Sequence, residues 1–151
     1  MQRDPRLSGY LTRALSHEMA AVQQYLMQAK LAGLWGMDEM STCMRKDVQE
    51  ELVHAERLME RMLVLGIPCN ATQLTPVRTG RSVEEMWQIN RELEMDAIRL
   101  YEEGSHYCAR IRDSETQALF DDILQEEVGH LRELERLLNT TQKGAGHEQG
   151  Q

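Results

Sequence analysis

The amino-acid sequence predicts an all-α protein, a bundle of four long helices with one long crossover between its second and third helices. Four stretches of the chain repeat apolar residues at helical spacing. The segments at 34–37 and 109–113 are short, whereas the segment at 66–81 is long and carries glycine and proline. Short links make antiparallel helix pairs, and a long segment can run the length of a bundle and join two such pairs.

The first two helices have clear start and stop signals. Asp4 followed by Pro5 predicts an N-cap and a proline in the first helical turn. The apolar stripe of this helix holds Leu7, Leu11, Ala14, Val22, Tyr25 and Ala29 and fades at 33–36. A second helix is expected to open at Asp38 and to end at Gly66. Its stripe holds Met44, Val48, Ala55, Leu58, Met62 and Leu65.

The third and fourth helices begin at residues that cap helices well. Ser82 and Glu85 form the pattern of a capping box, and Asp113 precedes the fourth helical stretch. The stripes are Val83, Trp87, Ala97, Tyr101 and Cys108 in the third helix, and Thr116, Phe120, Ile123, Leu134 and Leu137 in the fourth. The sequence therefore predicts one helical domain over 1–139. A polar, disordered tail without helix is expected over 140–151.

Composition excludes several classes of protein. The 151 residues are enough for one domain with a real core, and the net charge is −8. An acidic surface repels nucleic acid and anionic membranes. No uncharged apolar run approaches the roughly 18 residues of a membrane span, and no secretion signal is visible. The three cysteines make neither a disulfide framework nor a Cys-x-x-Cys site, so a cytoplasmic location is expected.

Two copies of a Glu-x-x-His pattern, at 51–54 and 127–130, carry the strongest functional signal. Each lies near the middle of its helix, and a single glutamate holds the same place in the other two helices. All four glutamates fall on apolar stripes, where a charge costs several kcal/mol unless it is paired or bound to metal. The candidate metal ligands are Glu18, Glu51, His54, Glu94, Glu127 and His130.

Four helices that supply Glu, Glu-x-x-His, Glu and Glu-x-x-His provide the ligands of a carboxylate-bridged two-metal centre. Four carboxylates balance two divalent cations, and mixed oxygen and nitrogen ligands suit iron or manganese and also admit zinc. The simpler interpretation is a chance motif with salt-bridged glutamates. Glu50 and Glu126, which precede two of the candidate ligands, are interpreted as solvated charges, although Glu50 could face a cavity. No internal repeat is identified beyond the duplicated motif.

With these residues in place, the sequence resembles the bacterioferritins, and more broadly the ferritin family, over residues 1 to about 139. The resemblance includes the spacing of all six candidate ligands and the context Gln23-Gln24-Tyr25 and Trp35-Gly36. It implies a ferritin-like bundle that assembles into a hollow cage of twenty-four subunits. Such a cage oxidises Fe(II) with O2 or H2O2 and stores the iron as ferric mineral.

The resemblance also implies a role for each residue of a di-iron centre with two irons per subunit. Glu18 and Glu94 resemble terminal ligands, Glu51 and Glu127 bridging ligands, and His54 and His130 the single nitrogen ligand of each iron. Tyr25 matches a family tyrosine that can supply an electron. An ordinary buried core tyrosine is an equally good interpretation of Tyr25.

The sequence departs from the family at four single positions and at its C-terminal segment. The methionine that binds haem between two subunits is Leu52 here, so a homo-oligomer is expected to lack the bis-methionine haem. A family histidine of the inner surface is Lys46, and aromatic positions near the centre are Leu58 and Glu133. The usual short fifth helix is not predicted at 140–151. These departures favour either a homo-oligomeric cage without haem or a mixed cage with a haem-binding bacterioferritin subunit.

Other functions remain open on the sequence alone. A rubrerythrin-like di-iron peroxidase would need an electron supply, and the chain has no Cys-x-x-Cys rubredoxin module. A structural or partner subunit of a mixed cage would carry the same inward charges in salt bridges without metal. A DNA-protecting mini-ferritin is disfavoured, because that group builds its site between subunits, whereas this chain supplies every ligand itself. A ferredoxin-like reductant is a candidate partner of the storage cage.

Overall fold

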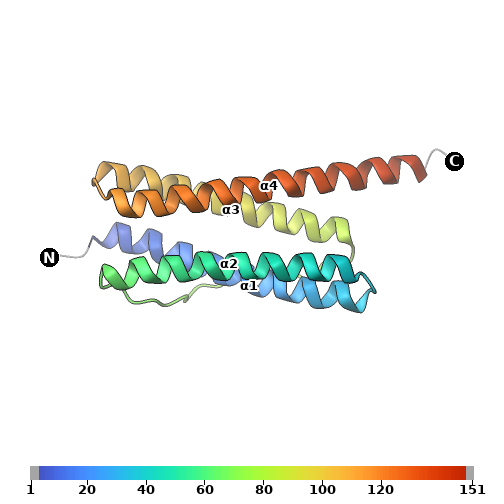
Figure 1. The fold of residues 1–151 in the computed structure, drawn as a ribbon, viewed down its shortest axis with the longest axis horizontal. Coiled ribbons are helices and arrows are strands. Elements are labelled where there is room, and N and C mark those ends of the chain that lie inside the picture. Colours follow the sequence, from blue (N-terminus) through green and yellow to red (C-terminus); the bar gives the residue numbers. More distant parts are fainter. Residues whose placement is uncertain (1–3, 149–151) are drawn as a thin grey trace.

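The computed structural model describes residues 4–148, with the side chains of residues 4–140, and confirms the predicted all-α bundle. Its helices are α1 (Pro5–Leu34), α2 (Asp38–Val64), α3 (Val83–Arg110) and α4 (Ser114–Glu148). No strand occurs among these residues. Figure 1 shows two antiparallel helical hairpins lying one on the other, α1 with α2 and α3 with α4.

Three of the helices begin at the capping residues that the sequence indicates. The side chain of Asp4 accepts hydrogen bonds from the backbone N–H groups of Arg6 and Leu7 at the start of α1. Ser82 accepts from the backbone N–H of Glu85 at the start of α3. At the start of α4, Asp113 accepts from the backbone N–H of Thr116. Each bond satisfies a donor that the first helical turn leaves without a partner.

Two turns depend on glycine. Gly36 has a φ of 76° in the short link between α1 and α2, and Gly66 has a φ of 71° directly after α2. Both angles lie in the left-handed region, where a side chain is strained and glycine is not. The turn after α3 makes the same excursion without glycine, since Arg112 has a φ of 59°.

The crossover between α2 and α3 runs along the bundle from one end to the other, as predicted (Figure 1). Gln24 of α1 ties it down, because its amide donates to the carbonyl of Arg78 and its carbonyl accepts from the N–H of Arg78. The Gln24 side chain is buried, so both bonds are shielded from water. The two hairpins meet mainly through α1 and α3, and much less through α2 and α4.

The core is divided into two apolar clusters. One is built by buried residues that include Leu11, Leu15, Leu58, Met62, Tyr101 and Phe120. The other is built by Ala21, Tyr25, Ala29, Met44, Val48 and Leu93. On α1 the first cluster ends at Leu15 and the second begins at Ala21, which leaves Glu18 between them. The predicted metal ligands therefore occupy a polar layer between two apolar halves of the bundle.

The C-terminal part of the chain differs from the expectation. Helix α4 continues to Glu148, so the predicted helix end at residue 139 is wrong. Residues 140–148 contain no proline, and a helix that already exists adds a hydrogen bond with each further residue at no new nucleation cost. Residues 149–151 of the predicted tail lie outside the described part of the chain, and no helix follows α4 within it. None of the described helices combines the length and apolar character needed to cross a membrane.

Candidate metal centre

Each helix of the bundle contributes one buried glutamate to the polar layer. The exposed fraction is 0% for Glu18, 1% for Glu51, 3% for Glu94 and 1% for Glu127. Each carboxylate is carried by the inward face of an amphipathic helix, close to the level at which the four helices pack together. Buried carboxylates at this density are stable only with compensating protons or cations.

Six side chains form two overlapping groups that each offer ligand atoms within 4.8 Å of one another. One group is Glu18, Glu51, His54 and Glu127, and the other is Glu51, Glu94, Glu127 and His130. Glu51 and Glu127 belong to both groups. The arrangement could hold two adjacent cations that share two carboxylates, and all six residues singled out from the sequence lie in it.

The donor atoms at the centre of this cluster are better suited to bind a cation than to form hydrogen bonds with one another. Buried atoms without a hydrogen-bond partner in the described structure include Glu18 Oε2, Glu51 Oε1, Glu94 Oε2, Glu127 Oε1 and His54 Nδ1. Buried polar atoms normally have a hydrogen-bond partner, so five such atoms without a partner in one layer require an explanation. Carboxylate oxygens and imidazole nitrogens are the donors that bind iron, manganese or zinc.

The two histidines turn the same edge toward the centre. His54 Nδ1 lies 3.0 Å from Glu127 Oε1 and 3.4 Å from Glu51 Oε2. His130 Nδ1 lies 3.6 Å from Glu51 Oε1 and 3.8 Å from Glu94 Oε1. The Nδ1 atoms are therefore the nitrogens available to a metal, and the Nε2 atoms point away from the centre.

Each outward-facing Nε2 atom meets a carboxylate from the opposite helix. Glu126 of α4 contacts Nε2 of His54, and Glu50 of α2 lies 2.7 Å from Nε2 of His130. A carboxylate on the far nitrogen fixes the ring and its tautomer and makes the near nitrogen a better metal ligand. The interpretation of Glu50 and Glu126 as solvated charges missed this role. Its signal in the sequence is the longer pattern Glu-Glu-x-x-His, which occurs twice.

The raised pKa values of two glutamates and two histidines show that the cluster favours bound protons, and hence positive charge. Burial, with the neighbouring charge of Glu51, raises the pKa of Glu18 well above its ordinary value, and burial with Glu94 does the same for Glu127. Burial acts to lower the pKa of His130, yet Glu94, Glu51 and Glu50 raise it to about 9. The nearby carboxylates of Glu127, Glu18 and Glu51 likewise outweigh burial and raise the pKa of His54. Without a metal the cluster retains protons, which divalent cations would displace.

Two buried tyrosines hold the outer oxygens of the two single glutamates. The hydroxyl of Tyr25 donates to Glu94 Oε1 at 2.7 Å, and the hydroxyl of Tyr101 donates to Glu18 Oε1 at 2.6 Å. In both glutamates the second oxygen, Oε2, is left without a hydrogen-bond partner. The tyrosines therefore position these carboxylates while leaving one oxygen of each free for a cation. Tyr25 is a predicted site residue, whereas Tyr101 was taken only as a core residue.

The structure reveals a repeat that extends beyond the duplicated motif. A spacing of 76 residues separates the members of five pairs: Glu18 and Glu94, Tyr25 and Tyr101, Glu50 and Glu126, Glu51 and Glu127, and His54 and His130. Both members of each pair lie in or against the centre. The two helical hairpins thus contribute equivalent halves, and this spacing is the sequence signal that could have identified Tyr101.

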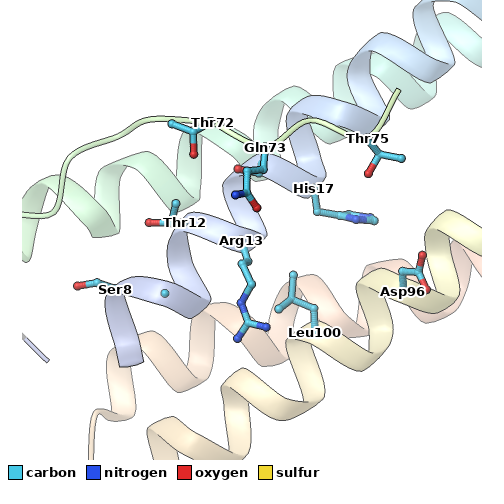
Figure 2. A pocket seen from close by; sticks show the side chains of 11 residues that line it. Ser8, Thr12, Arg13, His17, Thr72, Gln73, Thr75, Asp96 and Leu100 are labelled. Atoms are coloured by element: carbon cyan, nitrogen blue, oxygen red, sulfur yellow. The ribbon is translucent and has the colours of Figure 1, made fainter. Parts of the chain in front are cut away.

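One depression of the surface reaches residues of the centre, and a second one lies on another side of the bundle. On the side of α2 and α4, a cavity of about 320 Å³ is lined by Glu50, Val53, His54, Glu126 and His130. A larger groove of about 610 Å³ lies between α1, the crossover and α3. Figure 2 shows His17 projecting from α1 toward Asp96 of α3 in this groove, with Thr75 of the crossover nearby. Burial lowers the pKa of His17, so its imidazole is neutral in this groove.

The positions that depart from the family pattern have ordinary surroundings in this structure. Leu52 is 37% exposed on α2, and Lys46 lines a surface pocket of about 250 Å³ together with Leu26 and Arg45. Leu58 is fully buried in the first apolar cluster. Glu133 is exposed and pairs with Arg136 one turn later on α4. None of these side chains belongs to the two ligand groups.

Comparison with known proteins matches the sequence and the fold of this chain to one family. A family model described as a ferritin-like domain matches residues 9–144. The bacterioferritin of Streptomyces coelicolor is 35% identical over 144 residues, which cover 95% of this chain and 86% of that protein. The bacterioferritin of Rhodobacter capsulatus is 32% identical over 135 residues, covering 89% and 84% of the two chains. A solved structure of the R. capsulatus protein, described as having a metal-free dinuclear site and haem iron, superimposes with a TM-score of 0.91 at 30% identity, covering 95% of this chain and 89% of that one.

Proposed function

Because this chain belongs to the bacterioferritins, a group of proteins with the ferritin-like domain, we propose that it is a ferroxidase subunit of an iron-storage cage. Its fold and its relatives support iron storage as the general role. The proposed reaction is the oxidation of Fe(II) to Fe(III) by O2 or H2O2. The ligands that we assign to the two irons are Glu18, Glu51, His54, Glu94, Glu127 and His130.

The observation that carries this proposal is the sharing of Glu51 and Glu127 by two overlapping ligand groups. Two Fe(II) ions bound as substrate would each have one histidine, one carboxylate of their own and two shared carboxylates. The four carboxylates balance the four positive charges of two divalent cations, which removes the cost of burying them. Holding both ions side by side lets one oxidant molecule take an electron from each.

The cavity on the side of α2 and α4 is the route that we propose between the centre and the interior of a cage. Glu50 and Glu126 line this cavity and also contact the two histidines, so they offer oxygen atoms next to the centre. Hard oxygen ligands of this kind suit iron in either oxidation state. Ferric product would pass this way into a hollow homo-oligomer, where it is kept as mineral.

The cage itself, its composition and its surroundings are further parts of the proposal. Leucine at position 52 has no donor atom, which supports a cage without bis-methionine haem or a mixed cage in which another subunit supplies methionine. A ferredoxin-like protein is the proposed reductant that releases stored iron. We place the assembly in the cytoplasm, where thiols such as exposed Cys43 stay reduced.

Anaerobic titration of the metal-free protein with Fe(II), followed by mixing with O2 in a stopped-flow spectrometer, tests the function. We expect a fast absorbance phase in the near ultraviolet that saturates at about two irons per chain, with slower mineral growth after it. Slow oxidation without a break in stoichiometry would reject the ferroxidase and favour a structural subunit. Turnover of peroxide with a reductase, without net uptake of iron, would instead indicate a rubrerythrin-like peroxidase.

Replacement of a shared ligand tests the assigned residues in the same assay. Glu51→Ala or Glu127→Ala removes a carboxylate from both cation positions at once, and we expect the fast phase to disappear. Glu133→Ala is the control, because that carboxylate is exposed on α4 and pairs only with Arg136 among the described contacts. Wild-type rates in both shared-ligand variants would show that the centre lies elsewhere.

A further inference from the structure

Tyr101 is placed to take part in the chemistry of the centre, an inference that rests on the proposed ferroxidase function. Its side chain is 1% exposed, and its hydroxyl donates to Glu18 at 2.6 Å. The ring packs against Phe120, with 5.7 Å between ring centroids. Glu18 is therefore the acceptor of the Tyr101 hydroxyl in the structure, and Glu18 is an assigned ligand of one iron.

Tyr101 is the counterpart of Tyr25 in the other hairpin. Tyr25 of α1 donates to Glu94 of α3, and Tyr101 of α3 donates to Glu18 of α1, so the two bonds cross between the hairpins in opposite directions. The two bond lengths, 2.7 Å and 2.6 Å, are nearly equal. Tyr101 is therefore placed at the iron position of Glu18 in the same way as Tyr25 is placed at the iron position of Glu94.

The remaining two tyrosines of the chain lie elsewhere. Tyr107 donates to Asp4 near the start of α1, and Tyr10 packs against Tyr107 with 5.6 Å between ring centroids. Neither of them contacts an assigned ligand in the described structure. The phenols that hydrogen-bond the centre are thus Tyr25 and Tyr101, one for each iron position.

We propose that Tyr101 is a second electron donor to the oxidant at the centre, acting alongside Tyr25. When the Tyr101 phenol gives up one electron, its O–H bond breaks and the proton moves along the existing hydrogen bond to the Glu18 carboxylate. Loss of an electron makes a phenol far more acidic, so a carboxylate already accepting that bond is the natural proton acceptor. Burial keeps the resulting phenoxyl radical away from water and from external reductants.

The electron count explains what a second tyrosine adds. Reduction of one O2 to two waters needs four electrons and four protons, whereas two Fe(II) ions supply two electrons. Tyr25 and Tyr101 supply the other two electrons and, passed on by the carboxylates of Glu94 and Glu18, two of the protons, and solvent supplies the remaining two protons. The products are two Fe(III), two phenoxyl radicals and two waters. Without the tyrosines, two Fe(II) and two solvent protons reduce O2 only to hydrogen peroxide.

The test follows the radical and the iron in the same samples. Metal-free protein is loaded anaerobically with two Fe(II) per chain, mixed with O2 and frozen at successive times for electron paramagnetic resonance. We expect a tyrosyl signal that falls to about half in Tyr25→Phe and in Tyr101→Phe, if the two residues act independently, and that vanishes in the double variant. Incorporation of ring-deuterated tyrosine should narrow the signal that remains in Tyr25→Phe.

Two further measurements separate this inference from the proposed function. Near-ultraviolet absorbance should show that Tyr101→Phe still oxidises two irons per chain, at a rate reduced by the lost hydrogen bond to Glu18, and a peroxide assay should show that the double variant releases more hydrogen peroxide. Tyr107→Phe is the matched control, since it also removes a phenol-to-carboxylate hydrogen bond and should change neither the tyrosyl signal nor the oxidation of iron.

Fast iron oxidation with an unchanged tyrosyl signal in Tyr101→Phe would overturn the inference while leaving the ferroxidase intact. Loss of the fast phase in Tyr101→Phe would overturn it in favour of a purely positioning role for Tyr101. Failure of wild type to oxidise iron would reject both.

Discussion

The Nε2 atom of His130 on α4 lies 2.7 Å from a carboxylate oxygen of Glu50 on α2. The same relationship is repeated in the reverse direction between His54 on α2 and Glu126 on α4. These contacts link the two hairpins through α2 and α4, which pack together less closely than α1 and α3 do. They also hold both imidazoles with Nδ1 facing the candidate irons, so the orientation of two ligands depends on residues outside the six assigned ligands.

Neutralising these outer carboxylates should weaken metal binding. We expect Glu50→Gln and Glu126→Gln each to lower the affinity for Co(II) by about 10–100-fold, because the amide holds the imidazole less firmly and no longer strengthens its Nδ1 as a donor. Isothermal titration calorimetry of the metal-free protein gives the affinity. Glu56→Gln, at an exposed position of the same helix, is the control. Unchanged affinity in both variants would show that the contacts do not serve the centre.

Removing one carboxylate from the ligand layer should make the metal-free protein more stable and should abolish fast iron oxidation. In Glu18→Gln the amide oxygen can still accept from Tyr101, but the carboxylate, whose pKa burial and Glu51 raise, is gone. We expect the metal-free variant to gain about 1 kcal/mol, or about 2–4 °C in Tm, and to lose fast iron oxidation. Differential scanning calorimetry and the stopped-flow assay measure the two effects. A lower Tm in the metal-free variant would contradict this account of the cluster.

The stability of the metal-free protein should depend on the ionisation of His130. Its folded-state pKa is raised to about 9 from an ordinary value of 6.5, so protonated His130 stabilises the fold fully below pH 6.5. That contribution declines as the pH rises toward 9. We therefore expect the Tm advantage of wild type over His130→Asn to be largest near pH 6 and to shrink by pH 9.5. A Tm difference between wild type and His130→Asn that grows with pH over this range would contradict the prediction.

Position 52 should decide whether a homo-oligomer takes up haem. Leu52 is part of the exposed face of α2, and leucine cannot bind iron, whereas the thioether of methionine can. We expect cages of the Leu52→Met variant reconstituted with haem to show a strong Soret band that wild type lacks. Val53→Met is the control, because Val53 is the adjacent residue and is 51% exposed. Equal haem uptake by wild type and both variants would disprove the dependence on position 52.

The comparison between sequence and structure is most instructive in the second half of the chain. The capping signals at Ser82 and Asp113 located the starts of α3 and α4, because caps depend on residues within one turn of each other. The end of α4 was missed because a polar, glycine-containing segment carries no firm stop signal. Tyr101 was assigned to the core from its place on an apolar stripe, which is correct, but a stripe says nothing about the partner of a hydroxyl group.

The sequence by itself determined the four helices and their pairing through short links. It also determined the six side chains that the four helices together turn inward near their middles. Local spacing specifies these features, since the 3.6-residue period places Glu and His of a Glu-x-x-His motif on one face. Only the tertiary structure decided that Tyr101 bonds Glu18 and that Glu126 contacts His54, because these partners lie 83 and 72 residues apart. Such contacts arise from the way two hairpins are packed together, and no periodicity within a single helix records that packing.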